Sequence, residues 1–184
     1  KSTLLNVLGL LDRPDGGDYR LLGESTAGLD EEDRARLRRE HIGFVFQSYH
    51  LVARLSALEN IELPLLLAGI DRRLRRARVD EILQRLALTD RALHLPAQLS
   101  GGQCQRVAIG RAIAMKPALI LADEPTGNLD SRAGAEVTGL LEELNTEGIT
   151  LLVVTHDAAL GGRAPRRIRM RDGSIVADEC NAAA

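Results

Sequence analysis

Two short segments, separated by one expected helix, constrain this chain more than any other feature. Leu99-Ser100-Gly101-Gly102-Gln103 is a glycine-rich turn that runs into an expected helix over residues 104–115. Leu119-Ile120-Leu121-Ala122-Asp123-Glu124 is an apolar strand that ends in two carboxylates. Helix N-termini bind anions, and open α/β sheets place ligands at the carboxyl ends of their strands. Together the two segments indicate a chain that handles a nucleotide phosphate.

Each segment also has a plainer interpretation. Ser100 is a favoured N-cap residue, although two glycines at a helix start cost stability unless something, such as a phosphate, approaches the backbone. The acid pair could cap a helix, but the apolar run before it favours a metal-dependent hydrolytic site. Such a site needs Mg²⁺ to neutralise charge and a carboxylate to orient and deprotonate water. Asp123 suits the metal, through a coordinated water, and Glu124 suits the base.

The remaining sequence predicts an α/β fold. Apolar strands are expected at residues 42–46, 118–122 and 150–154, with helices at 30–39 and 132–146. Strands that are apolar on both faces and alternate with helices indicate a parallel sheet covered by helices. A short strand is expected at 19–22, a hairpin of 166–170 and 174–177 at the sheet edge, and a frayed tail at 181–184.

A helical block is expected between the two parts of this core. Helices are predicted at 57–68, where Pro64 should kink or end the helix, and at 71–88. Domain boundaries follow: residues 1–47 and 115–184 form the core, and 48–114 form an inserted helical subdomain. Arginines at 72, 73, 75, 76 and 78 could bind nucleic acid or lipid headgroups, but a solvated helix face is the favoured interpretation.

Composition narrows the function. The net charge of −2 gives no reason to expect nucleic-acid binding, and no apolar run could span a bilayer. Two distant cysteines indicate a reduced, cytosolic protein. We therefore expect a soluble chain that a partner brings to any membrane at which it works.

Four further segments can be interpreted in the light of the first two. Lys1-Ser2-Thr3 matches the end of G-x-x-x-x-G-K-[ST], in which the Lys reaches the β- and γ-phosphates and the hydroxyl binds Mg²⁺. Gln47 ends a strand, as a first loop residue or as a ligand. His156 follows the last core strand, as a structural residue or as a γ-phosphate sensor. Residues 127–130 form a turn that caps the next helix.

In these motifs the chain resembles the ATP-binding cassette (ABC) ATPase family over essentially its whole length. The segments that carry the resemblance are LSGGQ at 99–103, LILADE at 119–124, GNLD at 127–130, Gln47 and His156. Residues 44–69 and 122–130 look most like macrolide-export (MacB-like) and lipoprotein-releasing (LolD-like) ATPases, with MacB-like the closest. The resemblance implies a P-loop NTPase (RecA-like) core with an inserted helical subdomain.

The resemblance also implies ATP hydrolysis with Mg²⁺ in a head-to-tail homodimer, beside a transmembrane permease at the cytoplasmic face of the inner membrane. At the matching positions, the resemblance implies that Lys1, Ser2 and Thr3 bind phosphate and Mg²⁺ and that Gln47 and Asp123 bind the metal. It implies that Glu124 is the base and that His156 holds the γ-phosphate. It also implies that Ser100, Gly101, Gly102 and Gln103 contact the ATP of the other copy and that Asp130 is a strut across the dimer. No nucleic acid is expected, because DNA-repair relatives carry a long coiled coil in place of the compact block. An FtsE-like division ATPase on a membrane scaffold is the alternative, and the sequence does not separate the two.

Two departures from the family pattern stand out. Cys104 replaces the usual polar residue after LSGGQ, and we expect little effect. The glycines before Lys1, the strand before them and the adenine-stacking aromatic residue are missing. We therefore expect a chain incomplete at its N-terminus that binds ATP weakly or not at all, which measurable hydrolysis by this 184-residue chain would contradict. The transported substrate is not readable from the sequence.

Overall fold

A parallel sheet of three short strands organises the fold, and the computed structural model describes residues 1–180. The helices are α1 (Ser2–Leu8), α2 (Glu31–His41), α3 (Ala57–Leu67), α4 (Arg72–Arg85), α5 (Gly101–Ile113), α6 (Ser131–Thr146) and α7 (Ala158–Gly162). The strands are β1 (Arg20–Leu21), β2 (Glu24–Ser25), β3 (Ile42–Phe46), β4 (Leu119–Asp123), β5 (Thr150–Val154), β6 (Arg166–Arg171) and β7 (Ser174–Cys180). Two 3-10 turns, η1 (Thr89–Arg91) and η2 (Pro96–Gln98), precede α5.

The central sheet has the order β3-β4-β5, and both neighbouring pairs are parallel. This confirms the α/β prediction. The register pairs Phe46 with Asp123 and Asp123 with Val154. All three strands therefore end at one level, and the residues that follow them leave the sheet at the same edge.

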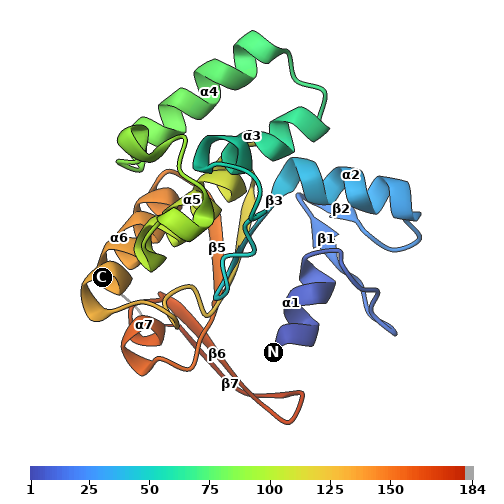
Figure 1. Cartoon of the computed structure of the whole chain (residues 1–184). Coiled ribbons are helices and arrows are strands. Elements are labelled where there is room, and N and C mark those ends of the chain that lie inside the picture. Colours follow the sequence, from blue (N-terminus) through green and yellow to red (C-terminus); the bar gives the residue numbers. More distant parts are fainter. Residues whose placement is uncertain (181–184) are drawn as a thin grey trace.

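Helices cover both faces of the sheet (Figure 1). On one face, α5 and α6 pack over Val45 and Ile120, which belong to the larger buried cluster. On the other face, α1 and α2 pack over Ile42 and Leu121, which belong to a second cluster with Leu5. The outer strand β5 is only half-buried, so it is less well covered than its apolar sequence predicts.

The helical block is joined to this core by α5. Helices α3 and α4 lie above the sheet in Figure 1, and α3 packs against both α4 and α5. The larger buried cluster runs without a break from Ile61 and Ile82 in the block to Ile120 in the sheet. Helix α3 continues through Pro64, so the expected boundary there is wrong. The division at residues 48 and 114 stays a prediction.

Three other expectations need correction. The strand expected at 19–22 is only the two residues of β1, paired with β2. The hairpin of β6 and β7 forms a two-stranded sheet of its own rather than an edge of the central sheet. Helix α5 begins at Gly101, three residues earlier than expected, because Ser100 caps it. The tail expected at 181–184 lies outside the described residues.

Two of the five clustered arginines of α4 serve the fold, and the other three are exposed. Arg75 pairs with Glu62 at 2.8 Å and donates to the Ile70 carbonyl at 2.7 Å. Arg78 donates to the carbonyls of Ile113 and Ala114 at the end of α5, where unsatisfied carbonyls attract cations. These contacts agree with the structural interpretation of the arginine cluster.

Candidate functional site at the carboxyl ends of the central strands

The carboxylate of Glu124 is the centre of the strand-end edge. Its Oε1 lies 2.7 Å from Nδ1 of His156, and its Oε2 accepts a hydrogen bond from the Thr155 hydroxyl at 3.0 Å. Thr155 and His156 directly follow β5, so the sheet register brings them beside Glu124. The Glu124 side chain is 20% exposed, which leaves one side open for a ligand.

This geometry determines how His156 can act. An ionised carboxylate only accepts hydrogen bonds, so Nδ1 of His156 must carry the proton that faces Glu124. The other ring nitrogen, Nε2, is then free, and the His156 side chain is 79% exposed. A phosphate oxygen is also an acceptor, so contact through Nε2 requires the doubly protonated ring. His156 thus bridges the carboxylate to whatever binds outside it.

The backbone of Glu124 is strained. Its φ of +47° lies in the left-handed region, which costs a non-glycine residue about 1–2 kcal/mol. Two backbone hydrogen bonds hold this conformation: the Glu124 amide donates to Val154 at 2.8 Å, and its carbonyl accepts from Gly127 at 3.0 Å. Strain of this kind is concentrated at functional sites, where the surrounding structure maintains it.

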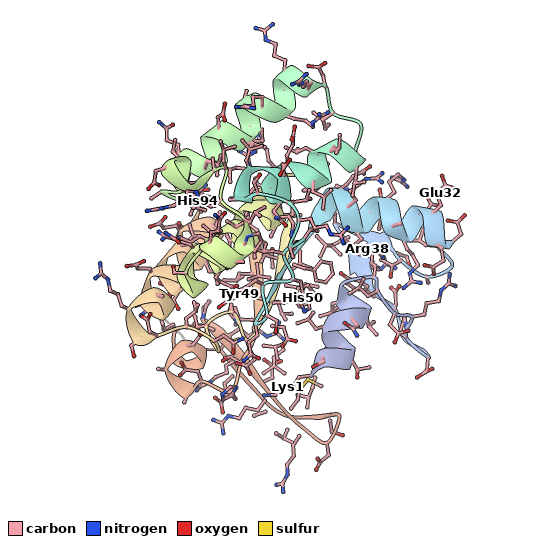
Figure 2. The ribbon with its side chains drawn as sticks, viewed as in Figure 1. Lys1, Glu32, Arg38, Tyr49, His50 and His94 are labelled. Atoms are coloured by element: carbon pink, nitrogen blue, oxygen red, sulfur yellow. The ribbon has the colours of Figure 1, made fainter. Side chains whose placement is uncertain are left out.

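Lys1 reaches the same edge from the opposite end of the chain. It is the N-cap of α1, and its Nζ donates to the Thr155 carbonyl at 3.4 Å. Figure 2 shows Lys1 at the start of α1, with its side chain among the segments below the sheet. Ser2 and Thr3 form the first turn of α1 and are exposed. The Lys1 ammonium group therefore contacts Thr155, whose hydroxyl is bonded to Glu124.

Gln47 and Asp123 supply oxygen atoms suited to a hard cation. Gln47 Nε2 donates to Asn128 Oδ1 at 3.0 Å, and Asn128 Nδ2 donates to the Gln47 carbonyl at 3.1 Å. This pairing leaves Gln47 Oε1 without a bond to Asn128, and Gln47 follows Phe46, the strand neighbour of the half-buried Asp123. Amide, carboxylate and hydroxyl oxygens such as those of Gln47, Asp123 and Ser2 are ligands that Mg²⁺ prefers.

A complete protein cage for a metal is not found. Among residues 1–180, no group of three or more His, Cys, Asp and Glu side chains is arranged to hold a metal ion. Magnesium is generally bound by one or two carboxylates together with substrate phosphates and water. The donor set on this edge fits that pattern.

The Ser100 turn is a capped helix start whose glycines are packed from within the chain. Ser100 and Gln103 form a capping box, with hydrogen bonds of 3.3 Å and 2.9 Å. A Cβ at Gly101 would lie 2.8 Å from the Tyr49 hydroxyl, and one at Gly102 would lie 3.0 Å from the Ala133 Cβ. A side chain at either position would displace a neighbour slightly, so packing within the chain also favours glycine here, and the glycines do not by themselves indicate a phosphate.

The turn still offers donors to an anion. The amides of Gly101 and Gly102 are in the first helical turn, where an amide has no partner in its own helix. Ser100 is exposed, and its oxygen accepts from Gln103 while its hydroxyl proton stays free. Helix α5 is 13 residues long, and its dipole adds positive potential at this end.

Asp130 caps a helix of its own chain. Its carboxylate accepts from the Ala133 amide at 2.9 Å and so caps α6, as the turn interpretation of residues 127–130 predicts. Within this chain, neither Asp130 nor Ser100 makes a hydrogen bond to Glu124, His156 or Lys1 among the described residues. The structure thus brings Lys1, Glu124 and His156 together and leaves the Ser100 turn as a separate surface.

The sequence did not predict the side chain that holds the loop after Gln47, which is Arg111. Tyr49 and His50 follow Gln47 and are both left-handed, with φ of 59° and 47° (Figure 2). Arg111 of α5 donates to both of their carbonyls, at 3.1 Å and 2.7 Å. Burial lowers the pKa of Arg111 and raises the pKa of Tyr49. The signal available was a charged residue among the apolar positions of α5, which the structure shows to be mostly buried.

Cys104 is buried, and its Sγ lies 3.5 Å from the Pro96 carbonyl. Burial raises the pKa of its thiol. No described helix is both long and apolar enough to pass through a membrane.

The sequence is similar to known proteins over most of its length. Residues 1–127 match the sequence model of the family described as "ABC transporter". The chain is 55% identical over 97% of its length to the macrolide export ATP-binding/permease protein MacB of Rhodopseudomonas palustris strain HaA2. It is 52% identical over 96% of its length to MacB of Escherichia coli strain K12. It spans only about a quarter (27%) of the length of both relatives.

Solved structures agree with the sequence relatives. The chain superposes with a TM-score of 0.89 on the dimeric post-hydrolysis structure of the ATP-binding cassette MJ0796 bound to ADP and Pi, at 42% identity. A second dimeric structure of MJ0796, described as a bacterial ABC transporter cassette, also gives 0.89, at 44% identity. Both matches cover 100% of this chain and 81% of the other. The P-loop NTPase fold is therefore confirmed, and the chain, which is similar to MacB proteins, belongs to the ABC transporter family.

Proposed function

We propose that this chain is the ATP-hydrolysing subunit of an ABC transporter of the MacB/LolD type, with Glu124 as the general base. One observation carries the proposal: the Glu124 carboxylate is held by Thr155 and His156 at the end of β4, in a strained backbone beside Lys1. A base held in place next to cationic groups is what attack of water on a phosphate requires.

The other residues of the edge take supporting roles. Lys1, with the first turn of α1 (Ser2 and Thr3), would bind the β- and γ-phosphates of ATP. Ser2, Gln47 and Asp123 would hold Mg²⁺, Asp123 through a water. The ion would supply neutralisation of the charge that develops on the phosphate oxygens. Doubly protonated His156 would donate from Nε2 to the γ-phosphate while Nδ1 keeps Glu124 in place.

A second copy of the chain would complete each site. The exposed Ser100 hydroxyl and the amides of Gly101 and Gly102 would bind an anion, and among the described residues Ser100 makes no hydrogen bond to the chain's own Glu124. A head-to-tail homodimer would direct them, with Gln103, at the γ-phosphate of the partner's ATP. Asp130 uses one oxygen to cap α6, and its other oxygen would be available across the dimer. The dimeric state of the MJ0796 cassette supports this arrangement.

The membrane partner is proposed from the relatives. The MacB proteins are named ATP-binding/permease proteins, and this chain spans 27% of their length. We infer that it acts as a peripheral unit at the cytoplasmic face of the inner membrane and drives export or extraction by a permease. The division-type alternative has the same cassette, and the membrane protein that co-purifies with the chain would distinguish the two.

The test replaces Glu124 by Gln in the full-length protein. This keeps the hydrogen bonds, because the amide oxygen can accept from His156 and the Thr155 hydroxyl can rotate to accept from the amide. Phosphate release should fall by about 10²–10⁴-fold, the usual worth of a general base, while ATP still binds. An ATP-bound dimer should accumulate and be visible by size-exclusion chromatography.

Glu143→Gln is the matched control. Glu143 is exposed on α6, and the same chemical change there should leave turnover at the wild-type rate. Near-normal phosphate release by Glu124→Gln would show that Glu124 is not the base.

A further inference from the structure

Gln105 is a buried amide in the middle of the molecule. It lies on α5, is 0% exposed, and its Nε2 donates to the Pro125 carbonyl at 2.7 Å. Its neighbours Val107, Ala108 and Ile109 are apolar and fully buried. The amide therefore links the helix that begins at the Ser100 turn directly to the loop that follows β4.

This link reaches the backbone next to Glu124. Pro125 is the residue after Glu124, and Glu124 is the strained, left-handed residue of the site. The direction of the Glu124 side chain depends on the backbone angles on both sides of its Cα. The amide and carbonyl of Glu124 are already held by Val154 and Gly127. The bond from Gln105 fixes the next peptide unit and so limits rotation of the loop.

Stability does not explain the amide. Its Oε1 is buried and has no hydrogen-bond partner among the described atoms. Burying an unpaired acceptor costs about 1–3 kcal/mol, which roughly cancels the gain from the single bond to Pro125. A Met or Leu of similar volume would remove the unpaired Oε1 but leave the buried Pro125 carbonyl without its donor, so the exchange would be roughly neutral for stability. A polar side chain that contributes little to stability here suggests a role in the site.

We propose that Gln105 is a positioning residue for Glu124, acting through the Pro125 carbonyl. The proposal rests on the proposed function, because it assumes that Glu124 is the base. It also gives a route from one site to the other: Gln105 is five residues from Ser100 on the same helix. Any shift of α5 when its N-terminus binds a second chain's nucleotide moves the Pro125 carbonyl, and with it the Glu124 carboxylate.

The experiment compares Gln105→Met with wild type in the full-length protein. Met has a similar length but no donor. We expect kcat for ATP hydrolysis to fall about 10- to 100-fold, as for a slightly misplaced catalytic group, with KM for ATP unchanged within about twofold. The midpoint of thermal unfolding should change little, because removing the unpaired Oε1 offsets the Pro125 carbonyl that loses its donor. Gln84→Met, at an exposed position of α4, is the matched control and should not change kcat.

A double variant separates positioning from general damage. Because Gln105 acts through Glu124, adding Gln105→Met to Glu124→Gln should not lower the residual hydrolysis further, measured in single turnover with radiolabelled ATP. An equal loss in both backgrounds would overturn the proposal, as would an unchanged kcat in Gln105→Met. Loss of turnover in Glu124→Gln together with a normal Gln105→Met rejects the positioning role alone. Normal turnover in Glu124→Gln rejects both proposals.

Should Gln105→Met fail to fold, Gln105→Asn carries the same test. Asn keeps a polar amide but is one methylene shorter, so it cannot reach the Pro125 carbonyl without movement of α5. The same fall in kcat is expected, and a wild-type kcat would overturn the proposal.

Discussion

Replacing Asn60 by Ala tests how the loop after Gln47 is held. Asn60 is fully buried at the start of α3, and its amide makes four hydrogen bonds to the segment before that helix. Oδ1 accepts from the Val52 amide at 2.8 Å, and Nδ2 donates to the carbonyls of Val52, Leu55 and Ser56 at 2.9–3.2 Å. The Asn60 side chain thus supplies hydrogen bonds to backbone groups of residues 52–56, which lie outside any helix or strand.

The loss in free energy of unfolding depends on which backbone groups lose their only hydrogen-bond partner. The Val52 carbonyl also accepts from the Leu55 amide, and the Ser56 carbonyl also accepts from the Asn60 amide. Only the Val52 amide and the Leu55 carbonyl are left unpaired. Because Val52 is exposed and Leu55 half-buried, water reaches part of these groups. At about 0.5–1.5 kcal/mol for each lost bond, Asn60→Ala should lower the free energy of unfolding by roughly 1–3 kcal/mol. That is a large part of the 5–15 kcal/mol typical of a domain.

Urea unfolding followed by circular dichroism measures this loss. Asn145→Ala is the control: Asn145 is exposed, makes one hydrogen bond to Ile149, and should cost less than about 1 kcal/mol. Asn60→Asp sharpens the test, because an oxygen would then face three carbonyl oxygens. Its pKa in the folded protein should be raised, so the destabilisation grows as the pH rises above about 4 and disappears as the carboxyl is protonated. A loss below about 1 kcal/mol in Asn60→Ala would refute the reasoning.

Two further outcomes are expected. Under native conditions a thiol reagent should modify exposed Cys180 quickly and Cys104 only after unfolding, because Cys104 is buried and its thiol pKa is raised; equal rates would contradict its placement. Arg111→Met should remove the donor that holds the carbonyls of Tyr49 and His50, at a cost of about 1.5–3 kcal/mol, and should speed amide hydrogen exchange in the loop after Gln47. Unchanged exchange there would show that this loop is held by other contacts.

Much of the fold could be predicted because its signals are local. Apolar runs of strand length predict β3, β4 and β5 within a residue, and parallel pairing of such strands puts their carboxyl ends at one edge. Lys1 and His156 are 155 positions apart, yet the motif order places both at that edge. The weaker predictions concerned the length of β1 and the sheet to which the β6–β7 hairpin belongs. Helix α7 was not predicted, because its five residues carry little periodicity.

The sequence by itself determined the family, the parallel sheet and the identity of the residues at its carboxyl edge, because motif spacing and strand hydrophobicity are properties of the chain alone. Only the tertiary structure decided what holds those residues. It supplied the Thr155 and His156 contacts to Glu124, the close neighbours of Gly101 and Gly102, and the buried bond from Gln105 to Pro125. Each of these joins segments far apart in the chain, and such contacts follow from the packing of helices on the sheet, which no local pattern specifies. The Ser100 turn, expected from the sequence to bind a phosphate, is in the structure a capped helix start with exposed donors, and its helix is linked to the loop after β4.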